Sequence, residues 1–505
     1  MTRVVVVGGG GAALRACLAA AERGARVTVV SKGKAGASGC THAIDSRIEF
    51  SVVNWPMMDP DTPLTYAADL ETIGRGLKAP ARVRLFAERS GDELRLLERL
   101  GLPLGAAGGC ARIQLAGSSY PRGIVCPPRF GTRVLQALRA ATPRTRVTVR
   151  DRAMAVEILT EGGRATGVVA LDLATGALDV VPADAVVLAA GGAGNVFSLS
   201  TNPRELVGDG YALGGRAGAA LDHMEFIQYV MLTVAPIRGW FLVTSVLLRG
   251  ELVDERGARC AAPVDPATAG PVEQKRLVAE FIGWIVARKR REPGARVFWD
   301  GRRIGRPALE AQMPKTYAAF RRRGHDLARR PVELDVGAHQ FLGGVVTDLA
   351  ARSTVPNLFA AGDVADSVQG ADRINGSGIM EALVFGALAG AGAAAADGLR
   401  ARPALPPAYR RESRHGADRL RGWGSRLKAE MDGILVVRDR VRLGALDARL
   451  AANLEELEAD GLRGADAPAT RALHELRSSL LTSRAVVRAS LARERDLGLF
   501  VTGQR

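Results

Sequence analysis

The sequence predicts an α/β fold that is interrupted by an α+β insertion and followed by a helical C-terminal domain. A run of β-branched residues, Val4–Val7, leads into the glycine cluster Gly8–Gly11. A second apolar run, Asp184–Gly194, also ends in glycines, and residues 408–497 read as almost continuous amphipathic helix. Strands that run into glycine turns are typical of a two-dinucleotide-binding-type (Rossmann-like) domain.

The N-terminal residues form one strand–turn–helix–strand unit. Val4–Val7 has the composition of a strand buried on both faces, as in a parallel sheet. The alanine-rich segment Leu14–Arg23 is amphipathic and predicts a helix that ends at Gly24. Val27–Val30 predicts the second strand, which completes a βαβ unit.

The turn in this unit fits the pattern G-x-G-x-x-A at Gly8, Gly10 and Ala13. The first glycine makes the tight turn, the second lets the backbone approach a pyrophosphate, and the small third residue lets the helix pack on the strand. Ser31 and Lys32 stand where an NAD-binding protein carries an acidic residue that grips the ribose. The sequence therefore predicts FAD, with Ser31 and Lys32 near its adenosine half.

Length and composition favour a globular protein in a reducing compartment. The 505 residues suffice for two or three domains, and 47% of them are hydrophobic. No stretch approaches the roughly 20 apolar residues of a membrane span, and a first strand at residue 3 leaves no room for a signal peptide. The 5 cysteines contain no C-x-x-C pair, which argues against structural zinc, disulfides or an iron–sulfur cluster. We expect a cytoplasmic protein with no metal site.

The net charge of +16 admits two interpretations. One is nucleic-acid binding, and the other is an arginine-rich, solvated surface. We favour the second because the basic runs are scattered and lack interleaved aromatics. The electrostatic field of a positively charged surface attracts anionic substrates. No nucleic-acid partner is expected.

The middle of the first half alternates between helices, loops and strands. After the small-residue loop Ser31–Thr41, residues 44–65 look irregular and residues 104–131 form a Gly- and Pro-rich loop. Helices are expected near 66–76 and 80–100 and at Phe130–Ala141. Strands are expected at Arg146–Val149, Ala155–Leu159 and Ala165–Leu173, with a hairpin turn at Asp172–Ala177.

The composition of the chain changes at two further points. Residues 221–336 have fewer glycine turns and more charged helix, including Val272–Arg291 and Ala308–Arg323. The pattern of the nucleotide-binding domain then resumes at Gly343–Asp348, Asn357–Asp363 and the helix Ser377–Ala395. A proline-rich linker, Arg402–Pro407, precedes the helical bundle, which is broken near Gly461–Pro468. We therefore expect an FAD domain at 1–232 and 337–400, a capping domain at 233–336, and a helical domain at 407–505.

These residues resemble the flavoprotein family of fumarate reductase, succinate dehydrogenase and L-aspartate oxidase, and most of all the L-aspartate oxidase branch. The landmarks occur in order along nearly the whole chain: Gly8–Ala13, Ser31-Lys32, Ser38–Thr41, Ala190–Gly194, Thr201–Pro203, Gly208–Gly210, Met224–Gln228, His339–Gly344, Ala360–Asp363 and Arg373–Gly386. The resemblance implies noncovalent FAD held by Gly8, Gly10, Gly11, Ala12, Ala13, Ser31, Lys32, Ser38, Gly39, Cys40, Thr41, Ala153, Ala190, Gly191, Gly192, Asn202, Asp209, Gly362, Asp363, Arg373, Ser377, Gly378 and Ile379.

Three departures from the family pattern fall near the implied substrate. Val230 stands at the position of the substrate-binding histidine, and His42–Ser46 replaces the usual glycine-rich loop against the flavin. The arginine that shuttles the proton lies in Thr-Glu-x-x-Arg-Gly-Glu, whereas the stretch here is Thr244–Glu251 and is one residue longer. Arg249 holds this role, or Leu248 takes its place. A covalent flavin link at Cys40 or His42 is not expected.

Dehydrogenation of a small acid needs a cation for the carboxylate and a group for the proton. Arg373 is the expected clamp because its guanidinium forms a bidentate fork; the alternative is a structural salt bridge to Asp372. The resemblance implies that His339 contacts substrate and that Arg249 moves the proton. Gln228 and Thr244 are expected to line the pocket.

The sequence predicts an FAD-dependent oxidoreductase that transfers a hydride between flavin N5 and a small amino acid or carboxylic acid, as L-aspartate oxidase does. Alternatives are a fumarate reductase or succinate dehydrogenase-type flavoprotein subunit, or a diverged flavoprotein that acts on a less polar substrate or serves as a non-catalytic subunit. Oxygen, a diffusible acceptor or a redox partner protein is expected to take the electrons.

Overall fold

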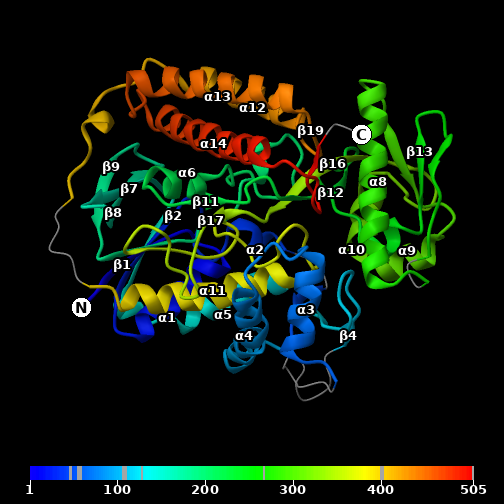
Figure 1. The fold of residues 1–505 in the computed structure, drawn as a ribbon, viewed down its shortest axis with the longest axis horizontal. Helices are drawn as coiled ribbons and strands as arrows, with labels where there is room; N and C mark the ends of the chain where they lie inside the picture. The colour runs from blue at the N-terminus through cyan, green and yellow to red at the C-terminus, as the bar shows by residue number, and fades with distance from the viewer. Residues whose placement is uncertain are drawn as a thin grey trace.

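The computed structural model describes residues 1–44, 48–53, 60–104, 111–126, 129–265, 268–397 and 403–502 (Figure 1). Residues 54–59, Cys110, the end of the segment His42–Ser46 and Arg402 lie outside these ranges.

A five-stranded parallel sheet forms the centre of the molecule and confirms the predicted α/β class. Its order is β18-β10-β1-β2-β6. Every side chain of the first strand from Val4 to Val7 is buried, because other strands flank it and helices or a second sheet cover its faces. The carboxyl ends of the strands meet at one edge, where glycine turns follow. The strands are β1 Arg3–Val7, β2 Arg26–Ser31, β6 Val147–Asp151, β10 Ala185–Leu188 and β18 Leu358–Ala360.

One face of the sheet is covered by helices that pack unusually closely. α1 (Gly11–Glu22) and α11 (Ser377–Ala394) lie side by side in Figure 1. A Cβ on Gly386 would lie 2.7 Å from Ala12 O, and one on Gly390 would lie 2.1 Å from Ala16 O. Among the described residues, α11 is one helix long and apolar enough to cross a membrane, yet 67% of it is buried. Its small apolar residues are therefore explained by close packing in the core.

The other face of the sheet carries a second, antiparallel sheet, β7-β8-β9, and a short helix. The predicted hairpin turn is confirmed: Asp172 Oδ1 accepts from the backbone N–H groups of Ala174 (2.8 Å) and Thr175 (2.9 Å). The elements of this layer are β7 Ala153–Glu161, β8 Arg164–Asp172, β9 Leu178–Pro182, α6 Asp209–Arg216, β11 Leu221–Asp222, β17 Gly344–Val345 and the 3₁₀ turns Arg144–Arg146 and Gly194–Val196.

The segment predicted as loop, 104–131, contains two strands of a small antiparallel sheet, β3-β5-β4, so that prediction was partly wrong. These strands are two to four residues long and leave no periodic pattern in the sequence. The elements around them are α2 Gly39–Ala43, β3 Ile48–Ser51, α3 Pro63–Ile73, α4 Pro80–Arg99, β4 Arg112–Ile113, β5 Gly123–Val125 and α5 Phe130–Ala141.

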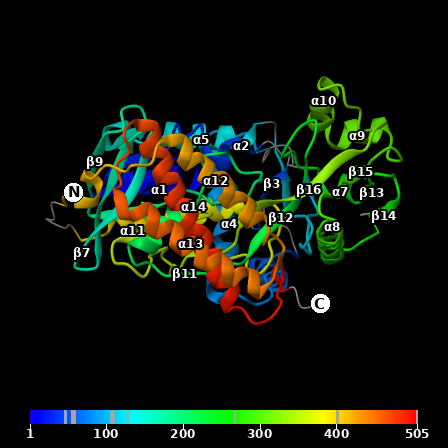
Figure 2. The ribbon, with the colours of Figure 1, turned by 90° about the horizontal axis from the view of Figure 1, so that it is seen from above.

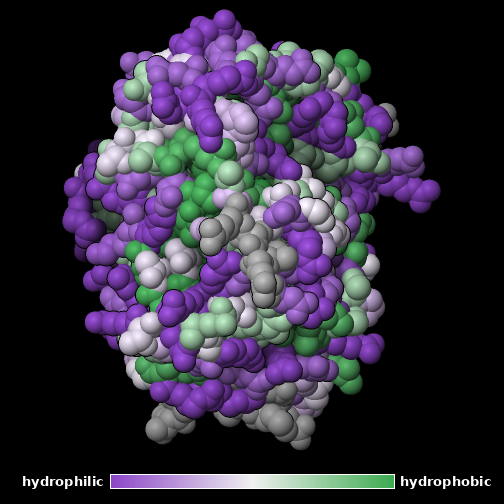
Figure 3. Space-filling view, turned by 90° about the vertical axis from the view of Figure 1, so that its left-hand side faces the viewer, coloured by the Kyte–Doolittle hydropathy of each residue, from purple (hydrophilic) through white to green (hydrophobic). Residues whose placement is uncertain are grey.

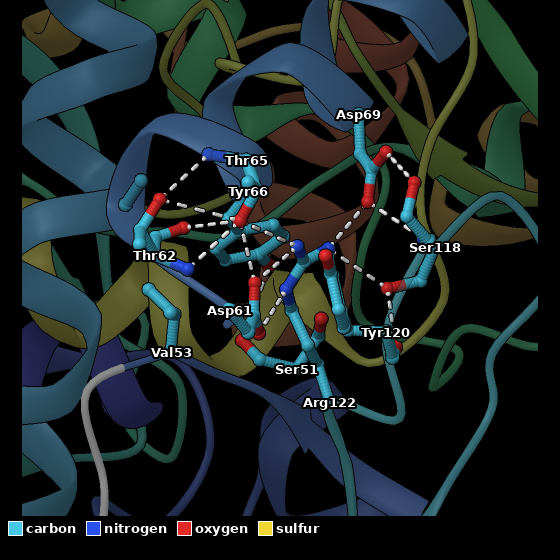
Figure 4. Close-up of polar contacts among 12 residues, drawn as sticks. Ser51, Val53, Asp61, Thr62, Thr65, Tyr66, Asp69, Ser118, Tyr120 and Arg122 are labelled. Atoms are coloured by element: carbon cyan, nitrogen blue, oxygen red, sulfur yellow. Dashed lines mark hydrogen bonds and ion pairs between the residues drawn. The ribbon is translucent and has the colours of Figure 1, made fainter. Parts of the chain in front are cut away.

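A buried arginine ties this small sheet to α3 (Figure 4). The side chain of Arg122 is fully buried; its Nη2 lies 2.6 Å from Asp61 Oδ1 and its Nη1 lies 2.5 Å from Asp69 Oδ2. The guanidinium carbon also stands 4.7 Å from the centroid of the Tyr66 ring. Asp61 precedes α3 and Asp69 lies within it, so the two ion pairs fix residues 112–126 against that helix.

The predicted insertion forms a separate lobe around a five-stranded sheet, β12-β16-β15-β13-β14 (right in Figure 1). Two of its strands, β12 and β16, cross the predicted boundaries at 232 and 337 and connect the lobe to the part of the chain that holds the parallel sheet. The predicted helix 308–323 is two helices, since Pro314 has no N–H to continue the first one. The elements are β12 Ile227–Thr233, α7 Thr244–Leu247, β13 Glu251–Asp254, β14 Arg259–Ala261, α8 Pro271–Arg291, β15 Val297–Asp300, α9 Arg306–Gln312, α10 Pro314–Arg322 and β16 Val332–Phe341.

Three long helices form the C-terminal domain, and α12 and α13 cross above α14 in Figure 2. Leu473, Leu476 and Leu480 are buried, as their helical spacing predicts. The chain then returns to the segment before α11, where Leu499 N donates to Ala371 O at 3.1 Å. The elements are the 3₁₀ turn Pro407–Arg410, α12 Ala417–Asp432, β19 Val437–Arg438, α13 Arg440–Asp460, α14 Ala467–Ala492 and β20 Val501–Thr502.

Hydrophilic side chains cover most of the face shown in Figure 3. Many arginines pair with nearby carboxylates; Arg276, for example, pairs with Glu273 and Glu280 on α8. This pattern fits the solvated, arginine-rich surface expected from the composition.

Candidate active site

A single cavity of about 1450 Å³ joins the carboxyl edge of the parallel sheet to the capping lobe. The glycine turn Gly8–Gly11 lines it at the sheet, and residues of α8 and of the α9–α10 junction line it at the lobe. Ligand pockets commonly measure about 300–1,000 Å³. This cavity has room for a large cofactor and a second small molecule.

The glycine turn has the geometry that a dinucleotide needs. Gly8 has φ +128°, and a Cβ there would lie 2.1 Å from Ala189 O, so only glycine fits. A Cβ on Gly10 would meet no atom closer than 3.9 Å. Because Gly10 lines the cavity, the missing side chain leaves space at the N-terminus of α1, where an anionic phosphate is stabilised.

Lys32 marks the far end of the cavity. Its ammonium lies 2.9 Å from Asp209 Oδ2 and 2.9 Å from Glu475 Oε1. Burial lowers the pKa of Lys32, but the two carboxylates outweigh it and raise the pKa above its usual value. Asp209 Oδ1 is buried without a hydrogen-bond partner and is an acceptor open to a bound ligand.

The middle of the cavity is formed by the end of β18 and the start of α11. Gly362 has φ +76° and approaches Ala12, and Asp363 Oδ1 accepts from Gln340 Nε2 at 3.1 Å. Burial raises the pKa of Asp363 to about 6, and the charge of Arg373 opposes that rise. Gly378 and Ile379, in the first turn of α11, line the same stretch.

Most of the residues predicted to bind the cofactor line this cavity. Four do not: Ala13, Ala153, Gly192 and Ser377. Ala153 precedes two lining residues, Met154 and Ala155, that the sequence analysis did not identify. The lining residues are Gly8, Gly10, Gly11, Ala12, Ser31, Lys32, Ser38, Gly39, Cys40, Thr41, Ala190, Gly191, Asn202, Asp209, Gly362, Asp363, Arg373, Gly378 and Ile379.

His339 and Arg373 both line the cavity. His339 Nδ1 lies 2.8 Å from Thr201 Oγ1, and its ring stacks on Phe241 with 6.4 Å between centroids. Burial lowers the pKa of His339 to about 3, with smaller contributions from the charges of Arg373 and Lys275. The imidazole is therefore neutral at physiological pH.

Arg373 presents an unsatisfied guanidinium. Its Nε is buried without a hydrogen-bond partner, and its contact with Asp372 runs through the backbone, from Arg373 N to Asp372 Oδ1 at 2.7 Å. Gln228 Oε1 is likewise buried and unpartnered, and Gln228 and Thr244 both line the cavity. These groups can bind a polar ligand.

The structure does not place Arg249 beside His339 and Arg373. Arg249 is not among the lining residues; its side chain is 38% exposed and lies 3.6 Å from Asp265. Thr244 and Leu247, three residues apart on α7, face the cavity instead. Because α7 ends at Leu247, the chain turns away before Arg249. The alternative residue, Leu248, is fully buried and also lies outside the lining.

Lys275 is a positively charged residue of the cavity lining that the sequence patterns did not predict. It lies on α8, lines the cavity, and donates from Nζ to Asp372 Oδ1 at 3.3 Å and to the backbone carbonyl of Arg373. The sequence shows it only as one of many charges on a helix of the insertion. Its role in the cavity depends on the lobe covering the edge of the parallel sheet.

Cys40 and His42 lie in and beside this cavity. Burial raises the pKa of the Cys40 thiol well above its usual value, so the thiol is protonated. Within the described part of the chain, no three His, Cys, Asp or Glu side chains are grouped so that they could hold a metal ion.

Comparison with known proteins matches the FAD binding domain family to residues 3–379. L-aspartate oxidase of Streptomyces coelicolor is 32% identical over 94% of this chain and 81% of its own length. L-aspartate oxidase of Caulobacter vibrioides is 30% identical over 98% of this chain and 91% of its own length. The fumarate reductase flavoprotein of Mycobacterium tuberculosis is 32% identical over 77% of this chain and 69% of its own length. The structure of Mycobacterium smegmatis Sdh1 in complex with UQ1 is similar in fold, with a TM-score of 0.85 and 24% identity over 100% of this chain and 89% of that one.

Proposed function

The chain belongs to the FAD binding domain family, together with fumarate reductase flavoproteins and L-aspartate oxidases, and on that premise we propose that it moves a hydride between FAD and a small carboxylic or amino acid. One observation carries the proposal. A single cavity contains the glycine turn, the start of α11, and the pair His339 and Arg373. A substrate held by that pair shares its cavity with the cofactor.

The bound FAD supplies the redox chemistry by accepting or returning a hydride. Arg373 holds the substrate carboxylate with its bidentate fork. His339 stays neutral, and its Nδ1 is hydrogen-bonded to the Thr201 hydroxyl. We assign the tautomer in which this hydroxyl is the donor, so that Nε2–H donates to the substrate. Thr244 and Gln228 complete the polar end of the pocket.

Oxidation of such an acid removes a hydride and a proton from neighbouring atoms. We assign the proton to Lys275 in place of Arg249: during reduction the ammonium gives a proton to the substrate, and during oxidation the ammonium first passes its proton to Asp372 and the resulting amine takes up the substrate proton. Asp372, which is 20% exposed and lies 3.3 Å from Lys275 Nζ, connects that amine with solvent. The proton therefore has a path that bypasses the buried imidazole.

Lys275→Met should lower kcat/KM by about 100-fold, the lower end of what general acid–base groups contribute. FAD content and the flavin spectrum should stay unchanged. Lys289→Met is the matched control, because Lys289 lies on the same helix, pairs with Asp335 and does not line the cavity. Equal rates for the two variants would exclude Lys275 from proton transfer.

The function is tested by an anaerobic screen of amino and carboxylic acids for bleaching of the flavin absorption band. Bleaching by any of them supports an oxidoreductase. A bound flavin that dithionite reduces but no acid reduces would favour the second candidate, a flavoprotein that is a non-catalytic subunit of a complex. Val230 at the substrate-binding histidine's position is the observation that favours this candidate.

FAD should be bound without a covalent link, because the Cys40 thiol is protonated and so is a poor nucleophile. Acid precipitation of the purified protein is expected to release the yellow colour into the supernatant. Colour that remains in the pellet would contradict this and would point to Cys40 or His42.

We infer a cytoplasmic protein that passes electrons to oxygen, a diffusible acceptor or a redox partner protein. The absence of a C-x-x-C pattern supports an acceptor outside this chain. Oxygen consumption during turnover, measured with and without an added dye, distinguishes an oxidase from a dehydrogenase.

A further inference from the structure

Beyond its polar end, the cavity has an apolar chamber beneath the capping lobe. We propose that the substrate carries a single carboxylate and that its apolar body lies in this chamber. This inference rests on the proposed function, because it assumes that Arg373 and His339 hold the carboxylate.

The first wall of the chamber is one face of α8. Lys275, Val278, Ala279 and Ile282 line the cavity at spacings of three, four and seven residues, which place them on one side of a helix. Lys275 contacts the carbonyl of Arg373, so the apolar stripe leads away from the polar end. At 1.5 Å per residue, it extends roughly 10 Å from Lys275 to Ile282.

A second set of apolar residues also lines the cavity and includes Phe241 beside His339. Val230 is buried on β12 and pairs in register with Gly337, two residues before His339 on β16. Phe241 stacks on the imidazole itself. Val243, Leu247 and Met313 belong to the same set.

The polar groups near the chamber already have partners. Thr316 Oγ1 accepts from Trp240 Nε1 at 2.9 Å, and Lys275 Nζ donates to Asp372 and to the Arg373 carbonyl. Lys315, which also lines the cavity, is exposed and already has an interaction partner. A second carboxylate would therefore lose its water without gaining a full set of donors.

The expected preference follows from that loss. An unsatisfied charged group costs about 1.5–3 kcal/mol, or about 10- to 150-fold in affinity. Monocarboxylates with an apolar body should bind more tightly than dicarboxylates of equal length by a factor in this range.

Binding is measured without turnover, as perturbation of the oxidised flavin spectrum by two matched series. One series runs from butanoate to octanoate and the other from succinate to suberate. Tighter binding of the monoacids supports the proposal. Equal or tighter binding of the diacids overturns it and leaves the proposed function intact. A flavin that neither series perturbs or reduces overturns both.

A substitution on α8 tests whether the apolar chamber lies beneath that helix. Ile282→Phe fills space beneath α8, so octanoate should bind about tenfold more weakly while butanoate binds as before. Val272→Phe is the control, because Val272 lies on the same helix but is 54% exposed and outside the cavity lining. Equal losses for octanoate and butanoate, or no loss for either, would show that the substrate body does not reach α8.

Discussion

Replacing Arg373 with alanine is expected to lower kcat/KM for the true substrate by about a thousandfold while FAD stays bound. Removing one partner of a buried charge pair costs roughly 3–5 kcal/mol, because the other charge is left unpaired. That cost corresponds to about 10²- to 10⁴-fold in rate. The side chain has an unpartnered Nε in the cavity, so no protein carboxylate competes for that donor.

Steady-state kinetics and FAD content per chain test this expectation together. Arg373→Lys keeps the charge but loses the fork, and its kcat/KM should fall between those of the wild type and the alanine variant. Arg302→Ala is the control, since this exposed arginine pairs with Asp300 in the capping lobe. Near-normal kcat/KM in the alanine variant would remove Arg373 from substrate binding.

Arg122→Met should destabilise the N-terminal region by about 3–5 kcal/mol. The change leaves Asp61 and Asp69 without the guanidinium that pairs with both, and Asp61 is only 7% exposed. The aromatic contact with Tyr66 is lost as well. Residues 113–116 line the cavity, so the same change should loosen its wall.

Denaturant titration monitored by the fluorescence of released FAD measures this effect. The matched control is Arg421→Met, which breaks an exposed pair with Asp418 and should cost no more than about 1 kcal/mol. A shift for Arg122→Met no larger than the control would mean that Arg122 does not hold the small sheet on α3.

Local sequence patterns predicted the first strand, the glycine turn and the first helix. Val4–Val7 and the glycines that follow specify strand, turn and helix within a dozen residues, and Phe130–Ala141 was predicted with the bounds the structure has. The motifs around His339 and Arg373 led us to predict both as substrate-binding residues, and both line the same cavity. The short strands β4 and β5 were missed because pairing, of β5 with β3 and of β4 with β5, determines them and periodicity does not.

Local sequence patterns could not identify Lys275, the residue to which we assign proton transfer. Arg249 stood at almost the expected spacing, yet the end of α7 turns it toward Asp265. Lys275 sits among other charges on α8, and only the docking of the lobe on the sheet edge reveals its contact with the Arg373 carbonyl. Such a long-range contact between two domains leaves no periodic signal in the sequence.

Gly8 and Leu499 line the same cavity, although nearly the whole chain lies between them. On the ribosome, the glycine turn and the parallel sheet's first strand emerge early, but the backbone bond from Leu499 to Ala371 forms only after the helical domain has been synthesised. Contacts this distant in sequence close late in folding. We therefore expect FAD to be captured only after the C-terminal segment has docked, so a cell short of flavin would accumulate chains whose cavity lacks its cofactor.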